Sequence, residues 1–165
     1  MEQKVSFALE EKCLILKIRH LEHNDFLKNK YLESLMLLSK EDLMNRFGYS
    51  SEESVQEYVN SSSGILFYIS RNDFYHETYD KMLACLHFVQ ISEDSAEIGF
   101  HVVPSQQRTG LAHELLMEAI QHARLNGIKK LITYCAVNNI KVQRLLTKLG
   151  FHINLHNQEA YIEVI

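Results

Sequence analysis

The chain has 165 residues, which suffices for one domain with a hydrophobic core but not for two. Hydrophobic residues make up 46% and charged residues 23% of the chain, an ordinary globular composition. The net charge of −4 argues against nucleic acid or an anionic membrane surface as the main partner. Neither a secretory signal nor an apolar run of the ~20 residues that a membrane span needs is visible. We expect a cytoplasmic protein in which residues 1–165 form a single domain, as a monomer or a homodimer.

The three cysteines are widely spaced and odd in number: Cys13, Cys85 and Cys135. They are interpreted as reduced and mostly buried thiols. No Cys/His cluster has zinc-ligand spacing, and the nearest histidine pair, His20 and His23, is read as an exposed turn. We therefore expect no metal.

The first third of the chain predicts a strand followed by helices. The strand is the apolar run CLILKIR (13–19), and the helices cover residues 24–39, 40–47 and 51–59. Asn24 or Asp25 is expected to cap the first helix, and serines cap the other two. Gly48 ends the second helix.

The rest of the chain contains segments with the two-residue period of strands and segments with the 3.6-residue period of helices. Three β-rich segments, 65–70, 81–91 and 96–103, predict an antiparallel meander with turns at Asn72-Asp73 and at 92–95. A helix at 110–126, a strand at 129–137, a helix at 139–149 and two short strands follow. This order predicts an α/β (mixed α+β) fold: a mostly antiparallel mixed sheet of six to seven strands with about four to five helices on both faces.

The loop before the long helix carries a chemical signal. QQRTGLAH (106–113) leads directly into the helix, whose first N–H groups have no intrahelical partners. Such amides, aided by the helix dipole, can hold an anion. Gly110 lets the backbone bend toward a ligand, and the small Ala112 leaves space. The pattern Gln107-x-x-Gly110-x-Ala112 therefore suits a pyrophosphate, although a plain strand-to-helix turn explains it equally well.

Three blocks of the sequence resemble the GNAT family of N-acetyltransferases. QQRTGLAHELL resembles the family's acetyl-CoA signature [RQ]xxGx[GA], and AEIGFHVV (96–103) resembles its central strand. NIKVQRLLTKLGF (139–151) resembles its second motif, a helix that an Asn opens and that ends in Leu-Gly-Phe. The blocks cover about residues 82–155. The Ala96-Glu97-Ile98 opening also resembles the branch of bacterial protein acetyltransferases.

This resemblance implies a GNAT domain that transfers acetyl from acetyl-CoA to a primary amine, a protein lysine or a small molecule, by direct attack in a ternary complex. The backbone amide of Val102 would meet the oxyanion, and Asn139 would bond the pantetheine arm, cap its helix, or do both. The other residues expected to bind acetyl-CoA lie in the loop and the first helical turn: Gln107, Arg108, Thr109, Gly110, Leu111, Ala112 and His113.

Glu97 is the candidate general base. Alternation along the strand places Glu97, Gly99 and His101 on one face, and Gly99 is expected to leave room for a substrate amine or a bridging water. Partial burial can raise the pKa of a carboxylate toward the range that a base needs. Related protein acetyltransferases use a strand Glu at this position. A solvated strand carboxylate is the alternative interpretation.

One position departs from the family pattern. Many members carry a Tyr as general acid where this chain has Leu146. Tyr134 and Tyr161 are candidate substitutes, or else core or surface aromatics. His87 is read as a packed strand residue and Cys135 as a buried thiol, not as an acyl-carrying nucleophile.

The missing tyrosine also leaves a second function open, a non-catalytic module that binds and senses acetyl-CoA. In the enzyme reading, residues 24–63, the loop near 71–80 and the C-terminal strands would frame the acceptor. The sequence leaves the acceptor itself unidentified.

Overall fold

The structure is a computed structural model that describes residues 5–9, 12–71 and 81–165, with side chains from residue 14 onward. The turn predicted at Asn72-Asp73, most of the acceptor loop near 71–80 and the side chain of Cys13 lie outside the described residues.

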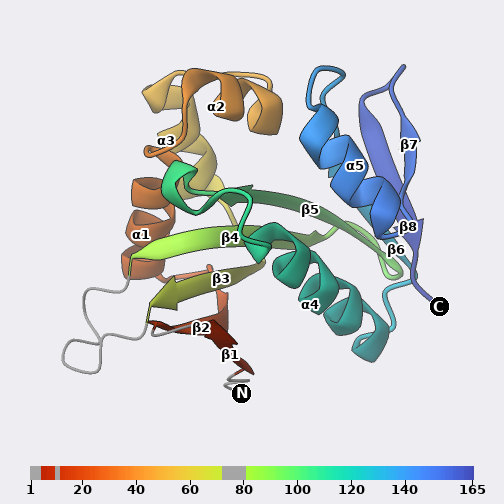
Figure 1. Cartoon of the computed structure of the whole chain (residues 1–165), viewed down its shortest axis with the longest axis horizontal. Helices are drawn as coiled ribbons and strands as arrows, with labels where there is room; N and C mark the ends of the chain where they lie inside the picture. Colours follow the sequence, from red (N-terminus) through yellow and green to blue (C-terminus); the bar gives the residue numbers. More distant parts are fainter. Residues whose placement is uncertain (1–4, 10–11, 72–80) are drawn as a thin grey trace.

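The elements follow the predicted order (Figure 1). The strands are β1 (Val5–Leu9), β2 (Lys12–His20), β3 (Ile65–Arg71), β4 (Met82–Gln90), β5 (Ser95–Val102), β6 (Lys130–Tyr134), β7 (His152–Asn154) and β8 (Glu159–Glu163). The helices are α1 (Asp25–Leu35), α2 (Lys40–Phe47), α3 (Glu52–Ser61), the short 3-10 helix η2 (Pro104–Gln106), α4 (Leu111–Leu125) and α5 (Ile140–Lys148). The mixed α/β class with a mostly antiparallel sheet is confirmed. The eighth strand is β1, which pairs with β2 and was not predicted.

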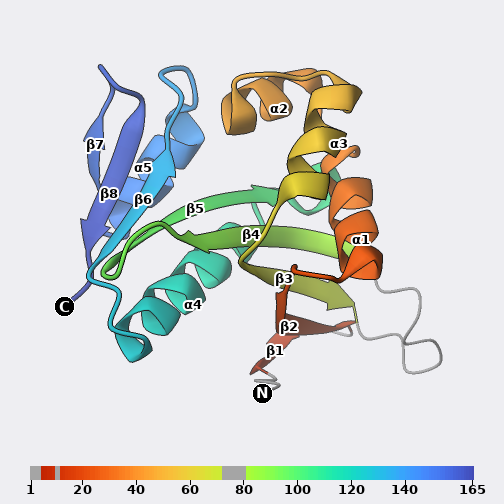
Figure 2. The same cartoon turned by 180° about the vertical axis from the view of Figure 1, so that it is seen from behind.

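The sheet has the order β1-β2-β3-β4-β5-β6-β8-β7. Its β5–β6 pair is parallel and is joined through α4, whereas the other pairs are antiparallel. The parallel ladder runs only from Ser95 opposite Lys130 to Ile98 opposite Thr133. Beside β4, however, β5 continues until Val102 opposite Ala84. The strands β5 and β6 therefore diverge after Ile98, as both views show (Figures 1 and 2).

Helices cover both faces of the sheet (Figures 1 and 2). Helix α4 buries the predicted stripe, Leu111, Leu115, Ala119 and Ala123, in the larger core with β3, β4 and β5. On the opposite face, α1, α2 and α3 enclose a second core around Tyr31, which is fully buried. Every described cluster thus contains residues far apart in sequence, as a layered domain requires.

The predicted helix caps are confirmed. Asn24, Ser39 and Ser51 accept hydrogen bonds from the backbone N–H groups of Leu27, Asp42 and Ser54, and Gly48 ends α2 with a φ of 78°. Helix α1 stops at Leu35, four residues before the predicted end. The chain there turns tightly, because Leu37 and Leu38 bond to carbonyls three residues back, and Ser39 then opens α2.

Candidate active site

The loop before α4 forms the turn that the sequence predicts. Arg108 and Gly110 have φ values of 65° and 88°, both in the left-handed region. The first backbone bond of α4 joins the N–H of Glu114 to the carbonyl of Gly110, so the preceding amides of the first turn have no intrahelical partner. A Cβ built on Gly110 would meet no heavy atom within 4 Å, so open space lies beside Gly110 at the start of this turn.

Gln107 and Leu111, both expected to bind acetyl-CoA, have side chains that contact the protein. The amide of Gln107 donates to the carbonyl of Val102 (3.2 Å) and to the Asp42 carboxylate (3.3 Å), and so positions the loop. Leu111 is buried in the larger core, because it begins the apolar stripe of α4. Leu111 can therefore offer a ligand its backbone N–H, and both residues stay predicted contacts of acetyl-CoA.

The other loop residues expected to bind acetyl-CoA lie at or near the surface. Arg108 is exposed, and Ala112 is half-buried in the first turn of α4. The Thr109 hydroxyl donates to the carbonyl of Gln106 and so braces the turn. His113 is half-buried, with Nδ1 at 3.6 Å from a carboxylate oxygen of Glu114.

Val102 lies where β5 has lost its neighbour β6. The N–H of Val103 donates to the carbonyl of Leu83 on β4 (2.9 Å). Backbone groups of an antiparallel strand alternate in direction, so the N–H of Val102 points away from β4. That direction leads to the gap that opens after Ile98, and the amide of Val102 is therefore available to a ligand between β5 and β6.

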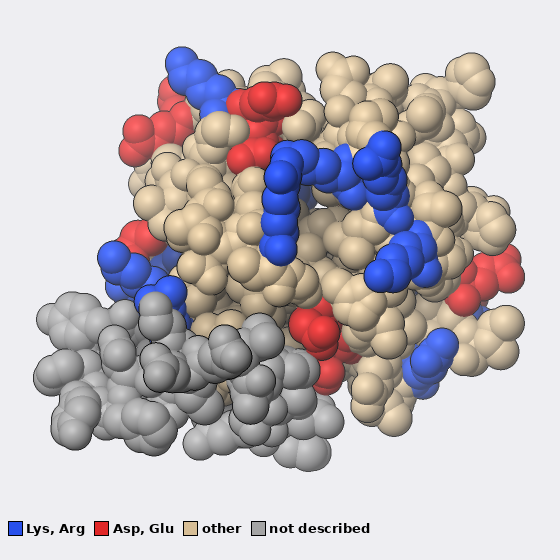
Figure 3. All heavy atoms as spheres, in the orientation of Figure 1, with Lys and Arg blue, Asp and Glu red and all other residues tan. Residues whose placement is uncertain are grey.

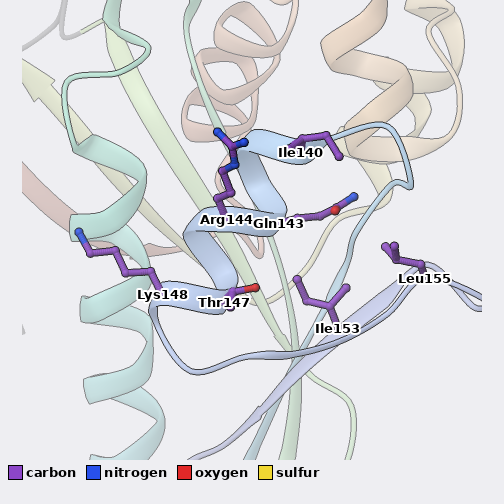
Figure 4. Close-up of a pocket in the computed structure, with 7 residues that line it drawn as sticks. All are labelled: Ile140, Gln143, Arg144, Thr147, Lys148, Ile153 and Leu155. Atoms are coloured by element: carbon purple, nitrogen blue, oxygen red, sulfur yellow. The ribbon is translucent and has the colours of Figure 1, made fainter.

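Cations gather beside this opening (Figure 3). The view shows Lys and Arg side chains around a hollow in the middle of the face, over the region between the first turn of α4 and α5. Arg144 and Lys148, both exposed, extend from α5, and Lys148 points toward α4 (Figure 4). Together with Gln143, Ile153 and Leu155 they line a groove of about 540 Å³. The sequence analysis missed these two cations, although their i, i+4 spacing next to inward-facing leucines was a signal.

Asn139 caps α5. Its side-chain oxygen accepts a hydrogen bond from the N–H of Val142 (3.3 Å), so the capping interpretation is confirmed. Asn139 is half-buried. Because the cap uses only the side-chain oxygen, the NH₂ group remains as a donor for a ligand.

Glu97, Gly99 and His101 share the sheet face toward α1, α2 and α3, as predicted from alternation. Glu97 is exposed, as in the alternative interpretation of a solvated strand carboxylate. The expectation that Gly99 leaves room for a substrate amine or a water is wrong, however. The space over Gly99 is filled by the guanidinium of Arg46, with which a Cβ on Gly99 would collide. The glycine therefore makes room for an arginine from α2.

A buried polar network lies beside Arg46. The two nitrogens of His87 meet the Tyr58 hydroxyl and the carbonyl of Ser63, and His101 Nε2 lies 3.0 Å from the Ser34 hydroxyl. Burial, with a smaller effect of the Arg46 cation, lowers the pKa of His87 to about 4 and that of His101 to about 3. Both rings are therefore neutral at pH 7. His87 is a packed strand residue, as predicted.

The residues considered as acid or nucleophile lie as follows. Leu146 is fully buried in the larger core. Tyr134 is on the exposed side of β6, and its hydroxyl donates to the side-chain oxygen of Gln158 (2.8 Å). Tyr161, on β8, stacks against His152 and carries Lys130 over its ring. Cys135 is free and buried, and burial raises its pKa, which confirms that it is no activated nucleophile.

Within the described ranges, no three His, Cys, Asp or Glu side chains gather as a metal site would require. The same part of the chain contains no helix long and apolar enough to cross a membrane.

An open mixed sheet that splits beside a helix N-terminus defines the fold class, and comparisons identify the family. The sequence model of the acetyltransferase (GNAT) family matches residues 32–151. The chain belongs to this family. No curated protein sequence matches it.

Solved structures resemble the whole chain at low sequence identity. The GNAT domain of PAT from S. lividans aligns with a TM-score of 0.67 and 14% identity, over 97% of this chain and 96% of that one. The spermidine N-acetyltransferase of Vibrio cholerae, solved with CoA and spermine, aligns with a TM-score of 0.60 and 20% identity, over 90% and 95%. The ribosomal-protein-S18-alanine N-acetyltransferase of Escherichia coli aligns with a TM-score of 0.59 and 19% identity, over 90% of this chain and 94% of that one. These likenesses establish the fold.

Proposed function

We propose that this chain is an acetyl-CoA-dependent N-acetyltransferase that acts on a primary amine, with residues 1–165 as one catalytic domain in the cytoplasm. The observation that carries the proposal is the loop at Arg108 and Gly110. Its left-handed backbone leads into α4, whose first-turn amides have no intrahelical partner, and open space lies beside Gly110. The pyrophosphate of acetyl-CoA would bind these amides, because they and the helix dipole favour an anion.

The cations of the same face support this placement. Arg108 is an exposed cation in the loop, Arg144 and Lys148 are exposed cations on α5, and Figure 3 shows Lys and Arg side chains around the hollow on this face. Phosphate groups would find both backbone donors and cations there. The pantetheine arm would then pass into the split between β5 and β6, near Asn139, and bring the thioester to the amide of Val102.

The proposed reaction is direct attack of the amine on the thioester. The nitrogen lone pair forms the C–N bond, the N–H of Val102 donates to the carbonyl oxygen as it gains negative charge, and the C–S bond breaks. Glu97 accepts the proton that the amine loses. Because Glu97 is exposed, this transfer runs through a water molecule as readily as directly.

The departing sulfur leaves as a thiolate. Leu146 cannot donate a proton, and the hydroxyl of Tyr134 is engaged with Gln158. A thiol of pKa about 8.5 is a tolerable leaving group without a general acid. Solvent then takes the proton from Glu97 and supplies one to the CoA thiolate, so the carboxylate is regenerated and the products are an N-acetyl amide and CoA.

The alternative function is a non-catalytic module that binds acetyl-CoA and senses it. Leu146 in place of a proton donor favours this reading. Labelled acetyl-CoA separates the two functions. The protein is incubated with polyamines, amino acids, aminoglycosides and lysine peptides, and labelled amide and free CoA are quantified together. Stoichiometric formation of both over many turnovers supports the enzyme. Tight acetyl-CoA binding with no product from any acceptor supports the sensor.

A further inference from the structure

Arg46, on α2, is a cation on the proposed acceptor side of the sheet, and no carboxylate of the described residues is its counter-ion. Its Nε is buried and lacks a hydrogen-bond partner, and Nη2 donates to the hydroxyl oxygen of Tyr58 at 3.4 Å. Among the residues that the structure describes, no carboxylate forms an ion pair with it. An arginine stays charged in proteins, and a charge withdrawn from water without a partner is costly.

The surroundings of Arg46 do not neutralise it. The guanidinium carbon lies 4.4 Å from the ring centroid of Phe47 and 5.9 Å from that of Tyr58, so aromatic faces hold the planar group. The Tyr31 hydroxyl nearby is buried without a partner, and burial raises its pKa well above the ordinary value, so it remains a neutral donor. Arg46 Nε and the Tyr31 hydroxyl thus both lack a hydrogen-bond partner, and no carboxylate of the described residues pairs with the guanidinium.

This donor pair is close to the candidate base. Arg46 covers Gly99, and Glu97 is the next residue on the same face of β5. Residues two apart on a strand are separated by roughly 7 Å. A small molecule could therefore meet Arg46 with one end and present its other end beside Glu97, at the edge of the split.

We propose that the acceptor is a small amine that also carries a carboxylate, an amino acid or a similar zwitterion, whose carboxylate pairs with Arg46 and whose amine lies beside Glu97. This proposal rests on the proposed acetyltransferase function. The planar guanidinium fork matches a carboxylate, and the Tyr31 hydroxyl supplies a further donor. A polyamine would instead bring a second cation against Arg46, which like-charge repulsion disfavours. Arg46 is then a substrate-binding residue that selects the acceptor by charge.

The test uses matched sets of acceptors with the full-length protein and labelled acetyl-CoA. Each set contains an amino acid, its primary amide and its decarboxylated amine, and spermidine is included for comparison. We expect kcat/KM for the amino acids to exceed that for the matched amides at least tenfold. Equal values within the sets, or spermidine as the best acceptor, would overturn the proposal while leaving the proposed acetyltransferase function intact.

Variants of Arg46 link that preference to one side chain. Arg46→Met should lower kcat/KM for the amino acid by at least about thirtyfold, the cost of leaving a buried charge pair incomplete, and change that for the amide less than threefold. Arg46→Lys keeps the positive charge but lacks the planar guanidinium. Its kcat/KM for the amino acid should therefore lie between the values of the wild-type protein and of Arg46→Met. An arginine with only a packing role would lower the melting temperature and leave the acid-to-amide ratio unchanged, which would contradict the proposal.

A binding measurement keeps the proposal decidable if no acceptor turns over or if Arg46→Met does not fold. Calorimetry with the CoA-loaded wild-type protein compares an N-acetyl amino acid with its amide. Preferential binding of the acid, weakened by Arg46→Lys, supports the carboxylate subsite even for a non-catalytic protein. Equal binding of acid and amide, or binding of neither, refutes it. Absence of turnover alone would count against the proposed function instead.

Discussion

The side-chain amide of Gln107 donates to the carbonyl of Val102 at 3.2 Å and so fastens the loop before α4 to the end of β5. The same group donates to Asp42 on α2 at 3.3 Å. One residue therefore connects the proposed pyrophosphate loop, the proposed oxyanion donor and a helix of the acceptor side.

Gln107→Glu should weaken acetyl-CoA binding by about tenfold, because a carboxylate cannot donate to Val102 and would repel Asp42. The neighbouring variant Gln106→Glu adds the same charge one residue away without breaking this bond, and it serves as the control. Calorimetric titration of acetyl-CoA measures both. Equal losses in the two variants would show that charge, and not the tie to Val102, determines affinity.

Gly110→Asp should abolish acetyl-CoA binding, with a loss of about a hundredfold or more, because a carboxylate would face the phosphates at close range. Gly127→Asp is the matched control. Gly127 follows the other end of α4, also has a positive φ (72°) and also has no atom within 4 Å of a built Cβ. Both variants carry similar backbone strain, and we expect only Gly110→Asp to lose binding. Unchanged acetyl-CoA affinity in Gly110→Asp would contradict the proposed binding of the pyrophosphate by this loop.

Reversing the charge of Arg144 or Lys148 should raise the dissociation constant of acetyl-CoA by about tenfold at low salt and less at high salt, because exposed charges are screened. Lys141→Glu, an exposed lysine on the same helix, provides the control. Titrations at two ionic strengths distinguish the variants. If Lys141→Glu weakens binding as much as Arg144→Glu, the effect is one of total charge and not of the cations that face α4.

Glu97→Gln should lower kcat at least tenfold and leave acetyl-CoA affinity unchanged, because the amide keeps the shape of the side chain but accepts no proton at neutral pH. Glu93→Gln changes an equally exposed glutamate in the turn before β5 and should have no effect. Steady-state kinetics with the best acceptor measures both variants. Full activity of Glu97→Gln would remove Glu97 from the mechanism.

Stability should fall as the pH decreases below about 6.5. Burial holds the pKa of His101 at about 3, and the unfolded state binds a proton near pH 6.5, so between these values only the unfolded state is protonated. The group contributes its full stability above this window and loses up to about 1.4 kcal/mol per pH unit within it. His87 adds a similar slope down to about pH 4. Urea unfolding at pH 7, 6 and 5 should give a shallower pH slope for His101→Gln. Identical slopes in the two proteins would show that His101 does not titrate as its burial requires.

Local patterns predicted most of the elements. Caps such as Ser39 and Asn139 depend on residues within one helical turn, and the shared face of Glu97, Gly99 and His101 follows from strand alternation alone. Contacts between residues far apart in sequence could be found only in the structure. Arg46 and Gly99 lie 53 positions apart in sequence and on different elements, so no local period could place the guanidinium over the glycine. The hydrogen bonds of Gln107 to Val102 and Asp42 could likewise not be predicted from the sequence.

The central claim is that the amides of the turn at Gly110 bind the diphosphate of acetyl-CoA. A crystal structure of the protein with CoA tests it most directly. The account predicts diphosphate oxygens within hydrogen-bond distance of the backbone N–H groups of the first turn of α4, with the pantetheine arm between β5 and β6. CoA bound elsewhere, such as in the groove beside Ile153 and Leu155, would contradict the account.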